Sequence, residues 1–422
     1  MSRALHRRTS ISSAIAIAAC ALFSTGSACT SSYAGRYIFW NYPTVEDHLI
    51  FPTRAIAPAP SPVSLEVRPT AIASLIGAQT TLWSAKATDG ASDDRAAPEQ
   101  RLRADNFAEF LADNETRSLL IARDGRLVYE NYFNNADRDT LMAGFSVSKS
   151  VVGLLAGIAL ADGSLQSIDD PLAQYVPELE SAPVGGIPLR DLLNMTSGIR
   201  FERASWPWAD APRSYHSSDL RGLVADAEIA APPGTAWLYS EFNPPLTAWA
   251  IERATGQTIA EFLESRVWRK AMAGEARWLV DDADRRVELA HAGFYATARD
   301  LLRLGLLVQY DGRIAGRRIL AAGLVRKITT LAGDDPEIIR GVPASFAPGG
   351  YAYKNGWWLP LDPETKQPTG DCIAAGLYGQ FVFISPARRL IIVRTGSDTG
   401  APGIAGWFSL LERLARAVHA ES

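Results

Sequence analysis

Residues 146–150 read SVSKS and open a strongly apolar helical run that continues through Leu160. Ser146 and Lys149 are three residues apart, close to one helical turn, so both side chains would lie on one face. At the helix start, Ser146 would lie beside unpaired backbone N–H groups and the positive end of the helix dipole. A lysine on so apolar a helix is poorly solvated. Desolvation favours the neutral amine, which can take a proton from a serine hydroxyl.

A purely structural interpretation competes with this one, because a chain of this length contains about one SxxK pattern by chance. Ser146 could be only an N-cap, and Lys149 could reach solvent along its aliphatic stem. The lysine is nevertheless unusual, since the chain has 6 lysines against 36 arginines. Solubility alone would not require one of them on this helix.

A second segment, PPGTAWLYSEFNPPL at 232–246, places Tyr239 after a Pro-Gly turn and before a helix that starts near Pro244. A serine–lysine pair often needs a third group that passes protons to the leaving group, and a tyrosine near cations can do this. Without the SVSKS segment, Tyr239 would be interpreted as a core residue. With it, the sequence predicts a serine, lysine and tyrosine acting together.

Strand and helix patterns surround these motifs. Apolar runs at 118–122 and 126–133 flank a turn and predict a β-hairpin, as do those at 380–385 and 390–395. Helical spacing marks 146–162, which ends at Gly163, and Trp407 to Ala420. The predicted fold is α/β, with an antiparallel β-sheet flanked by terminal helices and an inserted, mostly helical lobe at roughly 150–275.

Four segments in this order resemble the penicillin-recognising serine hydrolases, which include class C β-lactamases, DD-peptidases, family VIII carboxylesterases and 6-aminohexanoate-dimer hydrolases. They are SVSKS, LRDLLNMTSGI at 189–199, PPGTAWLYSEFNP at 232–244 and AAGLYGQFVFISP at 374–386. The resemblance covers about residues 100–420 and is strongest toward the esterase and oligomer-hydrolase branch. It implies a β-lactamase/transpeptidase-like fold, an α/β sandwich plus an all-helical lobe, and chemistry without cofactor or metal.

The resemblance also implies roles for individual residues. Ser146 matches the nucleophile that accepts the acyl group, Lys149 the general base, and Tyr239 the residue that relays protons. Leu377-Tyr378-Gly379 matches the β-strand triad that borders the site. The oxyanion hole would then be formed by the backbone N–H groups of Ser146 and Gln380.

Two positions depart from the family pattern. Leu377 stands where true β-lactamases have a lysine that helps bind substrate carboxylates, which argues against a dedicated β-lactamase or DD-peptidase. Glu241 stands where the second motif usually has asparagine. It could repel carboxylates or bind a cationic substrate end. Trp206 and Trp208 fall in an irregular loop that would line an apolar acyl pocket, whereas Trp357 and Trp358 on a late strand are interpreted as packing residues.

The sequence therefore predicts a serine hydrolase that cleaves small-molecule esters or amides through an acyl-enzyme, as a carboxylesterase or a 6-aminohexanoate-dimer-hydrolase-like amidase. One alternative is a DD-peptidase or weak class C β-lactamase. Another is a non-catalytic penicillin-binding-type sensor, which the presence of both Ser146 and Lys149 disfavours.

Composition and charge exclude other classes. A hydrophobic fraction of 47% with 21% charged residues predicts a globular fold, and a net charge of −4 gives no basic excess for nucleic acid. No serine has the GxSxG context of an α/β-hydrolase, and no group of histidines has metal-ligand spacing. His216 and His291 are interpreted as hydrogen-bonded polar residues, and His419 as part of the terminal helix.

The first 29 residues predict a signal peptide or lipoprotein signal, with a basic start, a short apolar run and small residues before Cys29. Cys20 or Cys29 could carry a lipid that tethers the protein to a membrane; plain secretion is the alternative. Either way, the protein is expected to be exported, periplasmic or secreted. Residues 30–100 are interpreted as an extension over the hydrolase domain at 101–422, and Cys372 is expected to form no structural disulfide.

Overall fold

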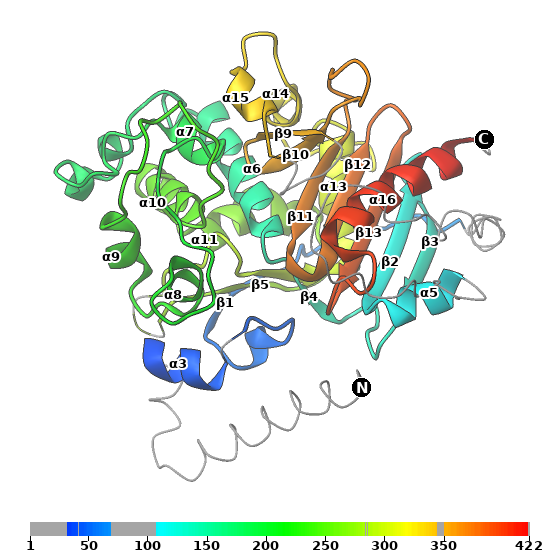
Figure 1. Ribbon diagram of the computed structural model, residues 1–422. Helices are drawn as coiled ribbons and strands as arrows, with labels where there is room; N and C mark the ends of the chain where they lie inside the picture. Colours follow the sequence, from blue (N-terminus) through cyan, green and yellow to red (C-terminus); the bar gives the residue numbers. More distant parts are fainter. Residues whose placement is uncertain are drawn as a thin grey trace.

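The computed structural model describes residues 32–40, 42–68, 107–282, 284, 286–343 and 350–420 (Figure 1). The predicted signal at 1–29 and the second half of the predicted extension lie outside these residues. Within the described ranges, no helix combines the length and apolar character that crossing a membrane requires. Cys372 is buried and has a free thiol.

The main sheet has seven antiparallel strands in the order β3-β2-β13-β12-β11-β10-β9. Both predicted hairpins are present in it, as β2 with β3 and β12 with β13. The strands are β2 Thr116–Arg123, β3 Arg126–Tyr132, β9 Tyr351–Lys354, β10 Trp357–Pro360, β11 Cys372–Gly376, β12 Gln380–Ser385 and β13 Leu390–Gly396.

Both faces of this sheet are covered by helices (Figure 1). Side chains alternate across a strand, so Phe381 and Phe383 of β12 join the core with α5 (Phe107–Asp113) and α16 (Gly403–Ala420). Val382 and Ile384 join the opposite core, with α6 (Val147–Ala161) and α13 (Ala298–Gln309). Burial on both faces explains why these strands read as nearly continuous apolar runs.

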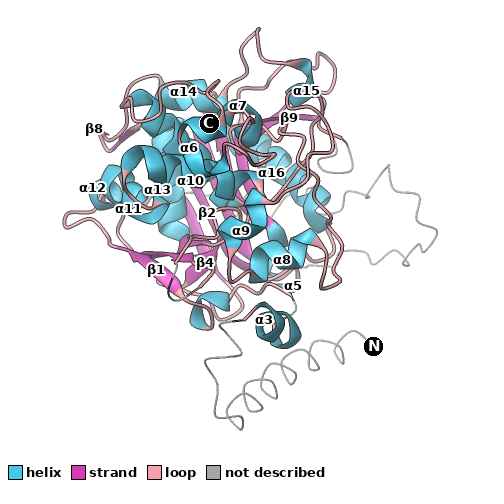
Figure 2. Cartoon of the chain, turned by 90° about the vertical axis from the view of Figure 1, so that its left-hand side faces the viewer, coloured by secondary structure: helices cyan, strands magenta, loops and turns pink. Residues whose placement is uncertain are grey.

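Between β4 (Leu141–Ala143) and β5 (Ala276–Leu279) every element is helical, and these helices lie on the side turned toward the viewer in Figure 2. This is the predicted helical insertion. It contains α6, α7 Leu189–Leu193, α8 Asp210–His216, α9 Leu220–Ala225, α10 Asn243–Thr255, α11 Ile259–Leu263 and α12 Arg269–Ala271, with short turns at Leu172–Gln174, Pro177–Leu179 and Glu264–Trp268. Smaller elements follow it, namely β7 Arg313–Ile314, β8 Arg317–Arg318, α14 Leu324–Thr329 and α15 Glu337–Arg340.

A second, four-stranded sheet has the order β1-β5-β6-β4. Its edge strand β1 (Thr53–Ile56) comes from the predicted extension and pairs with β5, Thr53 opposite Leu279. β6 (Phe294–Thr297) joins β5 to β4, which ends three residues before Ser146. The described part of the extension is thus a structural part of the fold rather than a cover over it.

Candidate active site

Ser146 is the N-cap residue of α6 and is partly exposed. The residue before it, Phe145, has a φ of 45°, a left-handed conformation that is strained for a bulky side chain. The Phe145 ring packs edge-on against Tyr378, with the ring centroids 5.4 Å apart. This strained turn connects β4 to α6 and places Ser146 at the start of the helix.

Lys149 lies one turn further along α6, and its side chain is 1% exposed. Its ammonium nitrogen donates hydrogen bonds to Ser146 Oγ at 2.8 Å and to the backbone carbonyl of His291 at 2.8 Å. It also forms an ion pair with the Glu241 carboxylate. The predicted contact between serine and lysine is therefore present, and the lysine is shielded from water.

Glu241 lies just before α10, with 17% of its side chain exposed. Burial alone would raise the pKa of its carboxyl, but the charge of Lys149, with smaller contributions from His291 and Arg203, holds the pKa below its usual value. The sequence suggested that Glu241 faces substrate. In the structure its carboxylate is paired with Lys149, a partner that no local pattern indicates, and its role toward substrate stays a prediction.

Tyr239 lies beside the same lysine. Its ring centroid is 5.1 Å from Lys149 Nζ and 4.8 Å from the Arg203 guanidinium, while Trp358 stacks on it at 5.9 Å. Arg203 also donates a hydrogen bond to the Tyr239 carbonyl at 2.9 Å. Two cations thus lie within contact range of this ring, and the role of Tyr239 as a proton relay stays a prediction.

His291 is buried against this group. Burial lowers the pKa of its ring to about 4, so the imidazole is neutral at neutral pH. Its two ring nitrogens have no hydrogen-bond partner among the described residues. The expectation that His291 is a hydrogen-bonded polar residue is therefore wrong for its ring. The residue is hydrogen-bonded through its backbone carbonyl, which accepts a hydrogen bond from Lys149.

Leu377-Tyr378-Gly379 is not a strand but the turn that joins β11 to β12. Tyr378 and Gly379 have φ values of 60° and 74°, which a strand cannot accommodate. The predicted β-strand triad is corrected accordingly. Of the three residues, Leu377 is exposed and Tyr378 is partly buried, with its hydroxyl bonded to the carbonyl of Pro43 at 2.8 Å.

The end of β11 reaches the nucleophile. A Cβ placed on Gly376 would lie 2.2 Å from the Gly144 carbonyl oxygen and 3.1 Å from the Ser146 backbone nitrogen. Only glycine fits so close to that backbone. By contrast, the Gln380 side chain is buried and holds the turn, donating to the carbonyls of Leu377 at 3.1 Å and Gly396 at 2.6 Å.

Arg394 is a site residue that the sequence interpretation missed. It is fully buried on β13 and donates to the carbonyls of Tyr378 at 2.8 Å and Gly379 at 2.7 Å. Burial lowers its pKa to about 9. Its position in an otherwise apolar strand, LIIVRTG, is the one local signal that could have revealed it.

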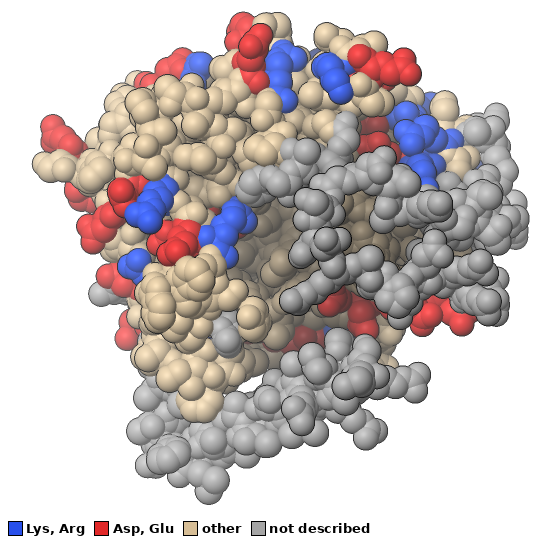
Figure 3. All heavy atoms as spheres, viewed as in Figure 1, with Lys and Arg blue, Asp and Glu red and all other residues tan. Residues whose placement is uncertain are grey.

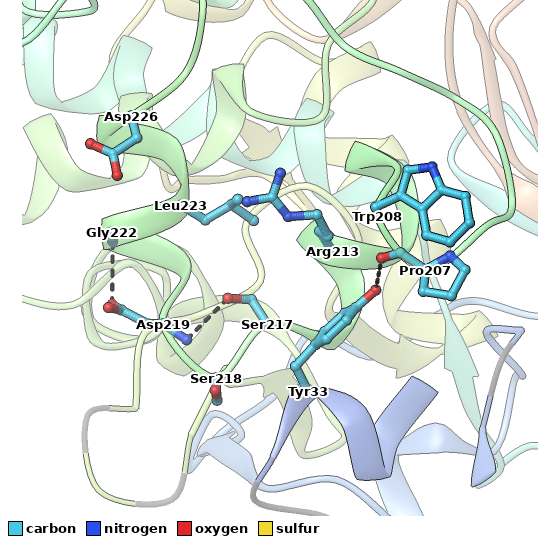
Figure 4. Close-up of a pocket in the computed structure, with 10 residues that line it drawn as sticks. All are labelled: Tyr33, Pro207, Trp208, Arg213, Ser217, Ser218, Asp219, Gly222, Leu223 and Asp226. Atoms are coloured by element: carbon cyan, nitrogen blue, oxygen red, sulfur yellow. Dashed lines mark hydrogen bonds between the residues drawn. The ribbon is translucent and has the colours of Figure 1, made fainter. Parts of the chain in front are cut away.

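The two pairs of tryptophans singled out in the sequence lie in different surroundings. Trp206 and Trp208 are 45% and 71% exposed. Trp208 borders a cavity of about 630 Å³ between α3 (Tyr33–Phe39) and helices α8 and α9, where the Tyr33 hydroxyl bonds to the Pro207 carbonyl (Figure 4). None of Ser146, Lys149 and Tyr239 lines this cavity. Trp357 and Trp358 are buried, as their interpretation as packing residues predicted.

Two other features of the described part of the chain concern metal ligands and surface charge. No group of three His, Cys, Asp or Glu side chains there could hold a metal ion. On the face drawn in Figure 3, acidic and basic side chains are interspersed over the described surface. Around Lys149 the described side chains include the Ser146 hydroxyl, the Tyr239 ring and the Glu241 carboxylate.

Comparisons with known proteins show which family the chain belongs to. The family model described as Beta-lactamase matches residues 104–412. The chain belongs to the beta-lactamase family. It is 29% identical over 329 residues to the 6-aminohexanoate-dimer hydrolase of Paenarthrobacter ureafaciens, covering 72% of this chain and 80% of that protein. Its hydrolase relatives identify the chain as a β-lactamase-related serine hydrolase.

Solved structures share the fold. A Bacillus anthracis protein assigned as a 6-aminohexanoate-dimer hydrolase superposes with a TM-score of 0.70 at 21% identity, over 93% of this chain and 97% of that one. EstCE1, a hydrolase with promiscuous acyltransferase activity, superposes with a TM-score of 0.57 at 19% identity, over 73% of this chain and 94% of that one. These matches confirm the predicted mixed α/β architecture.

Proposed function

We propose that this protein is an exported carboxylesterase or linear-amide hydrolase that works through an acyl-enzyme on Ser146. The observation that carries the proposal is the partly buried contact of 2.8 Å between Lys149 Nζ and Ser146 Oγ at the start of α6. A serine hydroxyl next to a water-shielded amine is an activated nucleophile. The similarity to a 6-aminohexanoate-dimer hydrolase supports an amide as the substrate. The similarity to EstCE1, a hydrolase with promiscuous acyltransferase activity, supports a reaction that transfers an acyl group.

In the proposed reaction, Lys149 as the neutral amine takes the Ser146 proton while Oγ bonds to the substrate carbonyl carbon. The carbonyl electrons move to oxygen and return when the leaving alcohol or amine departs. The leaving group takes a proton that Lys149 supplies through Tyr239. Water then attacks the acyl group by the same relay in reverse, which restores Ser146 and releases the acid.

The oxyanion requires two N–H donors. One is proposed to be the backbone N–H of Ser146. For the second, the close approach of Gly376 to that nitrogen favours the next peptide N–H, that of Leu377. Gln380, assigned this role from the resemblance, remains the alternative.

The proposal is tested by hydrolysis of short-chain p-nitrophenyl esters and of linear amide dimers by the wild-type protein and by Ser146→Ala and Lys149→Ala. We expect ester hydrolysis by the wild type and only background rates with both variants. Full ester hydrolysis by Ser146→Ala would reject the mechanism. Comparing ester with amide rates assigns the substrate class.

A cell-wall peptidase or β-lactamase is the second candidate. Penicillin-binding protein 4* of Bacillus subtilis is 25% identical, but over only 38% of this chain and 37% of its own length. Leu377 in place of the lysine that binds carboxylates also weighs against this candidate. Stable labelling of Ser146 by a fluorescent penicillin would favour it.

The proposed export rests on residues 1–29, which have the charge and apolar pattern of a signal peptide. Fractionation of expressing cells tests it, together with N-terminal sequencing and a search for lipid on the mature terminus. Recovery of the uncleaved chain in the cytoplasm would reject export.

A further inference from the structure

Lys149 Nζ is surrounded by three oxygen atoms, from Ser146 Oγ, the His291 carbonyl and the Glu241 carboxylate. The last two are acceptors only, so they require two N–H bonds of the lysine whatever its charge. The third direction faces Ser146. If the ammonium loses one proton, the lone pair of the amine therefore points at the serine hydroxyl.

The carboxylate in this arrangement belongs to Glu241, which is in direct contact with Lys149. Its side chain is 17% exposed, while that of Lys149 is 1% exposed. The other titratable or charged side chains around it are Lys149, His291, Arg203, Tyr239 and Tyr353. The His291 ring is neutral at neutral pH, so it adds no charge to this group. The positive charge of Lys149 is therefore balanced by the Glu241 carboxylate that it contacts.

We propose that Glu241 is a positioning residue that orients Lys149 toward Ser146 and sets the pH range in which the serine reacts. The inference rests on the proposed acyl-enzyme function. A carboxylate in contact with Lys149 favours the charged ammonium, whereas the reaction needs the neutral amine. The enzyme should therefore require a higher pH than the same site with an amide at position 241.

The test uses one fluorophosphonate probe, which needs no knowledge of the natural substrate. Ser146 Oγ bonds to phosphorus, fluoride leaves, and the serine proton passes to Lys149. The second-order labelling rate is measured over a series of pH values for the wild type, Glu241→Gln and Glu241→Asp. Glu130→Gln is the matched control, because Glu130 is also paired with a cation, Arg299, at 2.6 Å.

We expect the midpoint of the acidic limb to fall by about one to three pH units in Glu241→Gln. It should stay unchanged in Glu130→Gln. Glu241→Asp keeps the charge on a shorter stem, so it should keep the wild-type midpoint with a lower maximal rate. Thermal unfolding curves establish that each variant is folded.

An unchanged midpoint in folded Glu241→Gln would overturn the inference while leaving Ser146 as the nucleophile. If Glu241→Gln does not fold, the labelling rate of Glu241→Asp provides the test. A maximal rate equal to that of the wild type in Glu241→Asp would overturn the positioning role. Failure of the wild type to be labelled on Ser146 would instead reject the proposed function itself.

Discussion

Arg394→Lys should weaken both the fold and the turn beside the nucleophile. The five N–H groups of Arg394 donate to Thr116 Oγ1 and to four backbone carbonyls, those of Asn114, Tyr378, Gly379 and Asp398, at distances of 2.7 to 3.2 Å. Lysine has three donors, so at least two of these acceptors lose their partner.

The magnitude follows from that count. A buried polar group without a partner costs about 1–3 kcal/mol, so two of them predict a loss of about 2–6 kcal/mol in the free energy of unfolding. Two of the carbonyls belong to the turn at 377–379. A looser turn should also lower kcat/KM for esters about tenfold or more, measured well below the unfolding midpoint, because oxyanion donors act only when held in place.

Urea unfolding and ester kinetics measure both effects. Arg388→Lys is the matched control, since Arg388 is about one quarter exposed and its main partner is Asp371 at 2.9 Å. That change should cost at most about 1 kcal/mol. If Arg394→Lys is no more destabilising than Arg388→Lys, and its kinetics are those of the wild type, the reasoning about the turn is wrong.

Two further perturbations test other parts of the account. Gly376→Ala should abolish esterase activity even if the protein folds, because the added methyl would lie 2.2 Å from the Gly144 carbonyl; wild-type kinetics would contradict the proposed place of the oxyanion hole. Burial and the neighbouring Glu288 raise the pKa of Glu252 above its usual value, against the opposing charge of Arg221, so its contribution to stability is complete below about pH 4 and is lost as the pH rises from there through the raised pKa. Urea unfolding at several pH values should show that loss, on the order of 1 kcal/mol per pH unit within this range. Glu252→Gln should reduce it, and an identical pH dependence in that variant would refute the assignment.

Most of the helices and strands that were predicted from the sequence were predicted from local patterns. The hairpins, α6 and α16 were predictable because their apolar periodicity and turn residues are contiguous in sequence. The contact of Ser146 with Lys149 was predictable for the same reason, since it spans one helical turn.

Contacts between distant segments were not predictable from these patterns. The pairing of β1 with β5 joins residues more than 200 positions apart, and nothing in either strand specifies its partner. The Glu241 contact with Lys149 and the bonds from Arg394 to the 377–379 turn are likewise set by the packed fold. The strand predicted at 377–379 failed because a left-handed φ at Tyr378, a non-glycine residue, has no clear sequence signal.

The central claim is that Ser146 is the nucleophile. Its most direct test is mass spectrometry of the intact protein and its peptides after treatment with a fluorophosphonate, for the wild type and Ser146→Ala. The account predicts one adduct per wild-type chain, on the peptide that contains Ser146, and none on the variant. An adduct on another residue, or equal labelling of Ser146→Ala, would contradict it.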